Sequence, residues 1–362
     1  MRIVIAPDSF KGSLTAAEVA IAIAEGWRTI RPADDLLLLP QADGGEGTLA
    51  VVASAVPGSE FRSAGDVIGP DRRPTPAHWL ALPDGTAVVE LAQSSGLPLM
   101  AAPDPLGATT RGLGEVMAAA LDAGTTRLVI GLGGSASTDG GAGALAALGL
   151  RLLDDDDRPV GDGGGELARL ARLDRSGLRA APAGGVRLLS DVTAPLLGPA
   201  GAAAVFGPQK GASPDDVRTL DDALTIFAAL LGPDAATTPG AGAAGGAGFG
   251  FLAAWDAGIE LGSRAIADLT GLTAAAASAD VLLTGEGRYD ATSSSGKVVG
   301  TALTLPRSGR AGVIAGQLAA RPPRGVHAWG LAELAGSVDA AIADPTRWLR
   351  DAGAEAARTL GG

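Results

Sequence analysis

The sequence predicts an α/β protein of two domains. A parallel-sheet domain is built from both ends of the chain, and a mixed α/β domain is inserted between them in the sequence. Near the N-terminus, a short apolar run is twice followed by a polar loop and a helical segment, which is typical of parallel α/β units. From about 61 to 91 the pattern changes to short alternating segments separated by turns, which indicates an antiparallel or mixed sheet. The α/β pattern returns near the C-terminus. The expected bounds are 1–65 and 278–362 for the first domain and 66–277 for the second.

The first α/β unit begins at the N-terminus. Arg2–Ala6 is a continuous apolar run, as expected of a buried parallel strand. Thr15 and Glu18 have the spacing of a capping box, which predicts a helix from there to about Trp27. The turn between strand and helix carries polar residues that are candidates for binding a ligand: Asp8, Ser9, Lys11 and Ser13.

The second unit repeats this arrangement. Leu36–Leu39 is the predicted strand and a helix is expected from Leu49. The loop between them carries Asp43, Gly44 and Gly45. Both loops follow the carboxyl ends of their strands, where open parallel sheets bind ligands. A site in the first domain is therefore expected at this edge.

In the inserted domain, a glycine-rich loop follows a predicted strand. Ala77–Leu82 and Thr86–Leu91 are expected strands, Thr109–Ala123 a helix and Arg127–Ile130 a buried strand. The loop that follows contains Gly133, Gly134 and Ser135, which offer backbone N–H groups and a hydroxyl. These groups favour an anion-binding nest, and the alternative is an ordinary glycine-rich turn.

A single carboxylate ends another predicted strand. Asp191 follows Val186–Ser190, a common position for a general base or a Mg²⁺ ligand, and the alternative is that it caps the next turn. A helix is expected at Asp215–Leu231. The segment Thr237–Phe251 is almost entirely Gly and Ala, and we expect a close-packed loop or a hinge between domains. Its glycine spacing does not follow a strand, so it is not a dinucleotide-binding fingerprint.

The segment Val281–Lys297 concentrates charge near the C-terminal part of the chain. A buried strand is predicted at Val281–Leu283, followed by a glycine-broken loop that includes Gly285 and Gly287. The loop carries Glu286, Arg288, Tyr289 and Asp290, and a charged loop at the end of a strand is suited to holding an anionic ligand. Its final Gly296-Lys297 is not a Walker A motif, because Val298 follows and the upstream glycine is lacking. Strands at Ala311–Ala315 and Val326–Trp329 and a helix at Pro345–Thr359 complete the domain.

Lysine is rare in this chain. Of 28 basic residues only Lys11, Lys210 and Lys297 are lysine, and each stands beside a glycine. A compact ammonium differs from the broad guanidinium of arginine, so these positions are candidate phosphate-binding sites. The alternative is chance, since the chain has 55 glycines.

The composition excludes several function classes. The formal charge of −12 disfavours nucleic-acid binding. The absence of cysteine excludes thiol chemistry, and the two histidines lie outside the glycine-rich motifs, which disfavours a Ser-His-Asp triad. No signal peptide and no membrane-spanning run is recognised, so a soluble cytoplasmic protein is expected. The sequence gives no expectation of oligomeric state.

Six motifs, in order along almost the whole chain, resemble the bacterial glycerate kinases with a flavodoxin-like (Rossmann-like) domain and a restriction-enzyme-like domain. They are the segments 6–13, 42–48, 133–141, 206–211, 242–246 and 284–297. The resemblance implies phosphorylation of D-glycerate by MgATP, generally to 2-phosphoglycerate. Our hypothesis is that the two substrates meet in the cleft between the domains. The alternatives are a kinase of another small hydroxy acid, formation of 3-phosphoglycerate, and a non-enzymatic sensor of a nucleotide or phosphorylated metabolite.

Within this hypothesis each candidate residue has an expected role. Asp43, Asp191 and Lys11 are expected to be catalytic, with Asp43 or Asp191 as the base, and Asp191 or Asp290 is expected to hold Mg²⁺. The substrate-binding set is Asp8, Ser9, Ser13, Gly44, Gly45 and Arg288. The nucleotide-binding set is Gly133, Gly134, Ser135, Lys210, Gly285, Gly287 and Lys297.

The chain departs from the family pattern at four positions. Ser190 and Ala194 stand where Cys and Asn are usual, Thr138 replaces Asn, and Ala291 replaces Gln. The lost amides predict a shifted hydroxy-acid preference or an altered efficiency. Every lysine and carboxylate of the motifs is kept, so the expected reaction class is unchanged.

Overall fold

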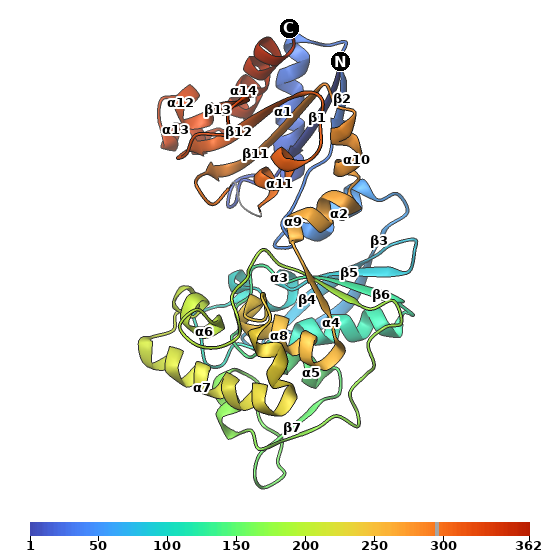
Figure 1. Ribbon diagram of the computed structural model, residues 1–362, viewed down its shortest axis with the longest axis vertical. Coiled ribbons are helices and arrows are strands. Elements are labelled where there is room, and N and C mark those ends of the chain that lie inside the picture. The colour runs from blue at the N-terminus through green and yellow to red at the C-terminus, as the bar shows by residue number, and fades with distance from the viewer. Residues whose placement is uncertain (294–296) are drawn as a thin grey trace. The chain divides into compact units, whose positions relative to one another are not determined.

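The computed structural model describes residues 1–293 and 297–362, in two compact units (Figure 1). The first unit contains Met1–Asp43, Ala50–Pro57 and Leu261–Gly362, and the second contains Gly44–Leu49 and Gly58–Glu260. The domain bounds inferred from the sequence differ from the bounds of these units and remain a prediction. Gly296, in one of the sequence motifs, lies outside the described residues.

The first unit is built on a parallel sheet whose strand order is β13-β12-β11-β1-β2. Counted along the chain, this is the order 2-1-3-4-5 of flavodoxin-like sheets, and the direction of winding reverses between β1 and β11. Ligands of such sheets bind at the carboxyl ends of the strands at this reversal. The strands are β1 (Arg2–Pro7), β2 (Asp35–Leu38), β11 (Val281–Tyr289), β12 (Arg310–Leu318) and β13 (Val326–Gly330).

Helices cover both faces of this sheet. On one face α1 and α14 pack against each other over Ile3, Ile5 and Leu283, and on the other face α10 packs over Val4 and Leu282. The predicted capping box of α1 is confirmed, since Thr15 Oγ1 accepts from the Glu18 N–H and the Glu18 carboxylate accepts from the Thr15 N–H. The helices with residues in this unit are α1 (Ala16–Ile30), α2 (Thr48–Ala55), α9 (Gly262–Leu269), α10 (Leu272–Ala277), α11 (Val298–Thr304), α12 (Leu331–Ala335), α13 (Val338–Ala343) and α14 (Pro345–Leu360).

The second unit holds a six-stranded mixed sheet of order β10-β9-β6-β5-β4-β3. Its pairs from β5 to β10 are parallel, whereas β3 and β4 run antiparallel. This confirms the predicted class, a parallel sheet and a separate mixed sheet. The strands are β3 (Glu60–Ile68), β4 (Pro74–Ala81), β5 (Thr86–Glu90), β6 (Arg127–Gly131), β9 (Val186–Leu189) and β10 (Gly258–Glu260). A separate two-stranded antiparallel sheet is formed by β7 (Arg151–Leu153) and β8 (Arg172–Asp174).

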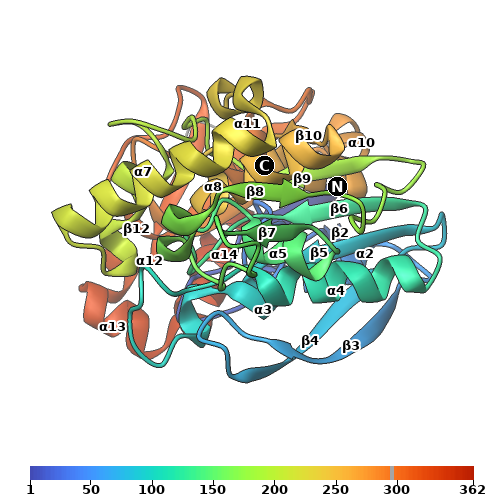
Figure 2. The same cartoon turned by 90° about the horizontal axis from the view of Figure 1, so that it is seen from below.

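Helices of the second unit enclose a large aliphatic core around Phe227 and Phe249. Figure 2 shows α4 beside β3 and β4, with which it packs. The helices are α3 (Ala92–Ser95), α4 (Arg111–Asp122), α5 (Ala142–Ala147), α6 (Ala202–Phe206), α7 (Pro214–Leu231) and α8 (Ala243–Trp255). Single 3₁₀ turns occupy Leu97–Leu99, Gly165–Arg169, Pro208–Lys210 and Pro233–Thr237.

Of the two expectations for Thr237–Phe251, the interdomain hinge is wrong, and the close-packed loop is found only in the part before the regular helix. Most of the segment belongs to α8, which is buried inside the second unit. Its glycines permit close packing, since a Cβ on Gly250 would lie 2.4 Å from the Gly140 carbonyl oxygen. The helical φ/ψ pattern is interrupted at Gly245 and Gly246, which have positive φ.

The prediction of a short strand and a charged loop at 281–290 is also wrong. Strand β11 continues to Tyr289, where it still pairs with Leu318 of β12. Gly285 does not interrupt the strand. It allows β11 and β12 to pack closely, since a Cβ on Gly285 would lie 2.1 Å from the Ile314 carbonyl oxygen. Glu286 and Arg288 are therefore held on a rigid strand. Within the described residues, no helix is both long and apolar enough to cross a membrane.

Candidate functional site

A cavity of about 430 Å³ lies in the first unit, lined by residues after β1 and β2, by residues near the carboxyl ends of β11 and β12, and by residues of α12, α13 and α14. This is the reversal point of the flavodoxin-like strand order, where ligand sites are expected. The cavity is lined by many of the residues that the sequence predicted: Asp8, Ser9, Lys11, Ser13, Asp43, Gly287, Arg288, Asp290 and Lys297. Segments some 280 residues apart thus meet at one site.

Asp8 has the most strongly shifted pKa in this cavity. The backbone N–H of Ser9 donates to Asp8 Oδ1 at 2.7 Å, and the Asp8 N–H donates to the Gly285 carbonyl at 2.8 Å. Burial, together with the charges of Asp43 and Glu286, raises the pKa of Asp8 to about 7, although Lys11 acts in the opposite direction. A carboxyl group with a pKa near neutrality can both take up and release a proton at working pH.

Glu286 lies on β11 beside Asp8. Its side chain is buried, burial raises its pKa, and Oε1 has no hydrogen-bond partner in the described part of the chain. The sequence showed Glu286 only as one of several charges and gave it no role. Glu286 was overlooked because the predicted strand was too short. A charged residue that follows an apolar run is typical of a loop, whereas Glu286 belongs to β11.

On the cationic side of the cavity, Lys297 and Arg288 lie near Asp290. Asp290 Oδ1 accepts from the Thr292 N–H at 2.8 Å and from Thr292 Oγ1 at 2.7 Å, which lowers the pKa of Asp290. Lys297 Nζ donates to the same Thr292 hydroxyl at 2.9 Å. Arg288 donates to Gln317 Oε1 at 3.1 Å and lies 4.0 Å from Asp290. Asp290, Thr292 and Lys297 are therefore linked by hydrogen bonds on this side of the cavity, with Arg288 beside them.

In the second unit, two predicted glycine segments lie against each other. The Gly133 N–H donates to the Gly44 carbonyl at 3.2 Å, and a Cβ on Gly133 would lie 2.4 Å from Gly45 Cα. Glycine is needed at Gly133 because a side chain there would collide with the backbone of Gly45. The structure therefore brings Gly44 and Gly45 to the loop of Gly133 and Gly134.

Glu90 holds the same segment and was missed by the sequence analysis. It ends β5, and its buried carboxylate accepts from the N–H groups of Gly47 and Leu49, both at 3.1 Å. Burial raises its pKa. The available signal was its position, since it follows the apolar run of a predicted strand. Its contacts place it as a support for the start of α2.

Lys210 is buried beneath the loop that contains Ser135. Its Nζ donates to the Ser137 carbonyl oxygen and to Ser135 Oγ, the latter at 3.3 Å. Burial lowers the pKa of Lys210 to about 8, while the charge of Asp139 opposes this shift. The Lys210 ammonium therefore binds the loop that contains Ser135 and Ser137.

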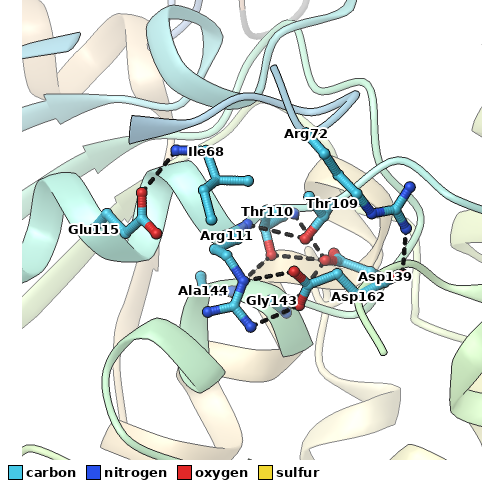
Figure 3. A network of polar contacts seen from close by, with 10 residues as sticks. All are labelled: Ile68, Arg72, Thr109, Thr110, Arg111, Glu115, Asp139, Gly143, Ala144 and Asp162. Atoms are coloured by element: carbon cyan, nitrogen blue, oxygen red, sulfur yellow. Dashed lines mark hydrogen bonds and ion pairs between the residues drawn. The ribbon is translucent and has the colours of Figure 1, made fainter. Parts of the chain in front are cut away.

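Asp139 anchors this loop (Figure 3). Its fully buried carboxylate accepts from the Thr110 N–H and Oγ1, both at 2.8 Å, from the Gly141 N–H at 3.1 Å and from the Gly143 N–H at 3.3 Å. Burial raises its pKa despite these bonds. Beside it, Arg111 forms a two-bond ion pair with Asp162. The neighbouring Thr138 is also fully buried, and among the described residues its Oγ1 has no partner.

The two predicted metal ligands lie in separate units, Asp191 in the second and Asp290 in the first. Asp191 follows β9, as predicted. Across the described ranges, 1–293 and 297–362, no group of three or more acidic or histidine side chains is arranged to hold a metal ion.

Comparison with known proteins adds to this geometry. The sequence model of the glycerate kinase family matches residues 3–361. The chain belongs to the glycerate kinase family. It is 45% identical to a glycerate kinase of Bacillus subtilis, over 82% of this chain and 79% of that protein. It is 44% identical to a glycerate 2-kinase of Escherichia coli, over 82% of this chain and 80% of that protein.

A solved member of the family has the same fold. The crystal structure of a protein described as glycerate kinase 2 from Salmonella typhimurium is 40% identical and superposes with a TM-score of 0.84. The match covers 100% of this chain and 98% of that one. The predicted family and fold class are therefore confirmed over the whole length.

Proposed function

We propose that this kinase transfers the terminal phosphoryl group of MgATP to a hydroxyl of D-glycerate, giving 2-phosphoglycerate and ADP. The observation that carries the proposal is the match to the glycerate kinase family over residues 3–361. Two of the three lysines, Lys11 and Lys297, line the cavity of the first unit together with Asp8, Asp43 and Asp290.

The turn after β1 is assigned to glycerate. Lys11 with the hydroxyls of Ser9 and Ser13 binds the substrate carboxylate or the transferring phosphoryl group, and Arg288 adds a second cation. These four residues line one cavity, which supports a joint role. Cationic and hydroxyl donors suit a carboxylate, because charge-assisted hydrogen bonds are the stronger ones. Gly44 and Gly45, which follow Asp43 in the sequence and belong to the second unit, remain assigned to substrate binding.

A carboxylate takes the proton of the reacting hydroxyl. As the hydroxyl oxygen bonds to phosphorus, the bond between phosphorus and the leaving oxygen of ADP breaks, and the proton passes to the base. The sequence assigned the base to Asp43 or Asp191. The raised pKa of Asp8, to about 7, adds Asp8 as a candidate, because a base works best when its pKa is near the operating pH.

The nucleotide phosphates are assigned to Lys297, to Gly285 and Gly287 of β11, and to the loop Gly133–Ser135. Gly287 and Lys297 line the cavity of the first unit. Lys210 supports the loop through Ser135 and Ser137, so its charge acts on the loop from beneath. Donors held in place before the reaction stabilise developing charge without reorganisation.

Magnesium fits the donors present. Mg²⁺ prefers oxygen ligands and is usually held by one or two carboxylates together with substrate phosphates, so a preformed cluster is not required. Asp290, with its lowered pKa, is ionised and suited to this role, and Asp191 is the alternative. When bound, the ion neutralises phosphate charge.

Steady-state release of ADP tests the proposal. The enzyme is incubated with MgATP and either D-glycerate, L-glycerate, lactate or tartrate, with and without a chelator. We expect ADP release that requires both D-glycerate and the divalent ion. Turnover with another hydroxy acid but none with glycerate would instead support the alternative kinase, whose motivation is the loss of family amides at Thr138, Ala194 and Ala291.

A further inference from the structure

The cavity of the first unit has an aliphatic side that the chemistry of glycerate does not require. It is formed by five residues of α12, α13 and the start of α14: Leu331, Val338, Ala341, Ile342 and Pro345. Val338 is 41% exposed and Ile342 is 64% exposed. Apolar side chains that are clustered in one patch and rimmed by polar groups are characteristic of ligand-binding grooves.

The size of the cavity also exceeds the needs of a three-carbon acid. Its volume of about 430 Å³ falls in the range of roughly 300–1,000 Å³ that is typical of sites for larger ligands. Glycerate is polar on every carbon and would leave the aliphatic side in contact with water. A ligand that uses the whole cavity has one apolar part and one strongly anionic part.

We propose that the aliphatic side, centred on Val338 and Ile342, is the nucleoside subsite for ATP, with the phosphate chain directed toward Lys297 and Lys11. This inference rests on the proposed function, which makes ATP a substrate. Adenine has apolar faces that pack on aliphatic side chains, whereas the phosphates need the cations at the other side of the cavity. The two sides of the cavity match the two halves of the nucleotide.

The framework around this subsite is fixed by packing. Helix α13 packs against β12 and α12, and α12 packs against β12 and β13 (Figure 1). Gln317, near the end of β12, lines the same cavity, and its Oε1 is held by Arg288. The Gln317 carboxamide is therefore placed where it can exchange hydrogen bonds with the edge of a base or a ribose.

The acidic residues of the cavity do not oppose an anionic ligand as strongly as their number indicates. Burial raises the pKa values of Asp8 and Glu286, which favours their neutral forms. Lys11, Arg288 and Lys297 supply positive charge. The cavity holds three cations and four carboxyl groups. Of the four, Asp8 and Glu286 have raised pKa values, and Asp290 is the proposed Mg²⁺ ligand.

Ligand binding without glycerate tests the subsite. Calorimetry measures the affinity of ADP and of inorganic tripolyphosphate for the wild type and for the double variant Val338→Gln/Ile342→Gln, both as Mg²⁺ complexes. Glutamine is uncharged and favours helices, so the fold and the charge of the cavity are kept. The matched control is Ile21→Gln, on α1, where the side chain is 50% exposed and does not line the cavity.

We expect the double variant to bind ADP about tenfold more weakly or worse, since two aliphatic contacts are lost, with little change for tripolyphosphate. Ile21→Gln should bind both ligands as the wild type does. Unchanged ADP affinity, or an equal loss for both ligands, would overturn the subsite.

The same variants separate this inference from the proposed function. If the wild type phosphorylates glycerate while the double variant keeps its ADP affinity and its KM for ATP, the subsite is wrong and the function stands. If the double variant loses ADP binding while the wild type does not phosphorylate glycerate, the function is wrong and the nucleoside subsite stands.

Discussion

At the scale of single residues, the three lysines have two kinds of environment. Lys11 and Lys297 line the cavity of the first unit, whereas Lys210 is buried and bonded to the carbonyl of Ser137. Their rarity in an arginine-rich chain pointed to positions where a guanidinium does not fit. Lys11 and Lys297 thus share one cavity, whereas Lys210 contacts the loop of Ser135 and Ser137. The phosphate-binding roles of all three lysines remain proposals.

Replacing Lys11 with arginine tests the need for an ammonium. The charge is kept, but the broad planar fork cannot occupy the place of a compact point charge. We expect Lys11→Arg to lower kcat/KM for glycerate by about tenfold or more, equivalent to about 1.4 kcal/mol of transition-state stabilisation. Arg28→Lys on the exposed end of α1 is the matched control and should keep full activity. Near-normal turnover of Lys11→Arg would refute the ammonium requirement.

Asp8 predicts a pH-dependent cost to stability. Its pKa is 3.8 as an ordinary group and about 7 in the fold. Between these values the folded protein keeps a proton that the unfolded chain has lost, so its contribution to the free energy of unfolding falls as pH rises and levels off above about pH 7. Each unit of raised pKa corresponds to about 1.4 kcal/mol.

Asp8→Asn removes this cost and keeps the shape of the side chain. We expect thermal unfolding at pH 8 to show a melting temperature a few degrees above that of the wild type, with a difference that shrinks toward pH 5. The variant should also lose activity if Asp8 acts as the base. A melting difference that is the same at pH 5 and pH 8 would contradict the raised pKa.

At the scale of secondary-structure elements, β11 explains both a success and a failure of sequence reasoning. The apolar run Val281–Leu283 was enough to predict a buried strand. Its continuation to Tyr289 could not be predicted, because glycines and charges at 285–288 are locally typical of a loop. The strand continues there because β12 supplies pairing partners, and such partners are a tertiary property.

Two glycines of β11 give a matched pair of variants. A Cβ on Gly285 would lie 2.1 Å from the Ile314 carbonyl oxygen, whereas a Cβ on Gly287 would meet its nearest atom at an ordinary 3.6 Å. We expect Gly285→Ala to lower the free energy of unfolding by about 1–3 kcal/mol, as overpacking does, and Gly287→Ala to change it little. Urea unfolding measures both. Equal stability of the two variants would show that the strands are not so close.

Asp139 and Thr138 form a second matched pair, in the glycine-rich loop of the second unit. Asp139 accepts from four donors, and an amide in its place would turn N–H groups toward some of them. We expect Asp139→Asn to cost about 1–3 kcal/mol in denaturant unfolding. Thr138→Val, equally buried, should cost nothing or stabilise slightly, because the hydroxyl has no partner among the described residues. A reversed order would contradict this assignment of the loop's anchor.

At the scale of the whole molecule, the sequence predicted the two sheets, the α/β class and most motif residues at the site. Those residues could be predicted because carboxyl ends of parallel strands gather at one edge, whatever the distance along the chain. Glu90, the length of β11 and the burial of α8 could not, because each depends on a partner segment that no local pattern reveals. The aliphatic side of the cavity was missed for the same reason, since α12 and α13 are short.

The most direct test of the central claim is the phosphorus NMR spectrum of the reaction of the enzyme with MgATP and D-glycerate. We predict that the terminal phosphate signal of ATP is replaced by the signals of ADP and of a phosphate ester at the 2-position of glycerate. A spectrum that retains ATP after prolonged incubation would contradict the assigned activity. An ester signal at the 3-position would contradict the assigned product.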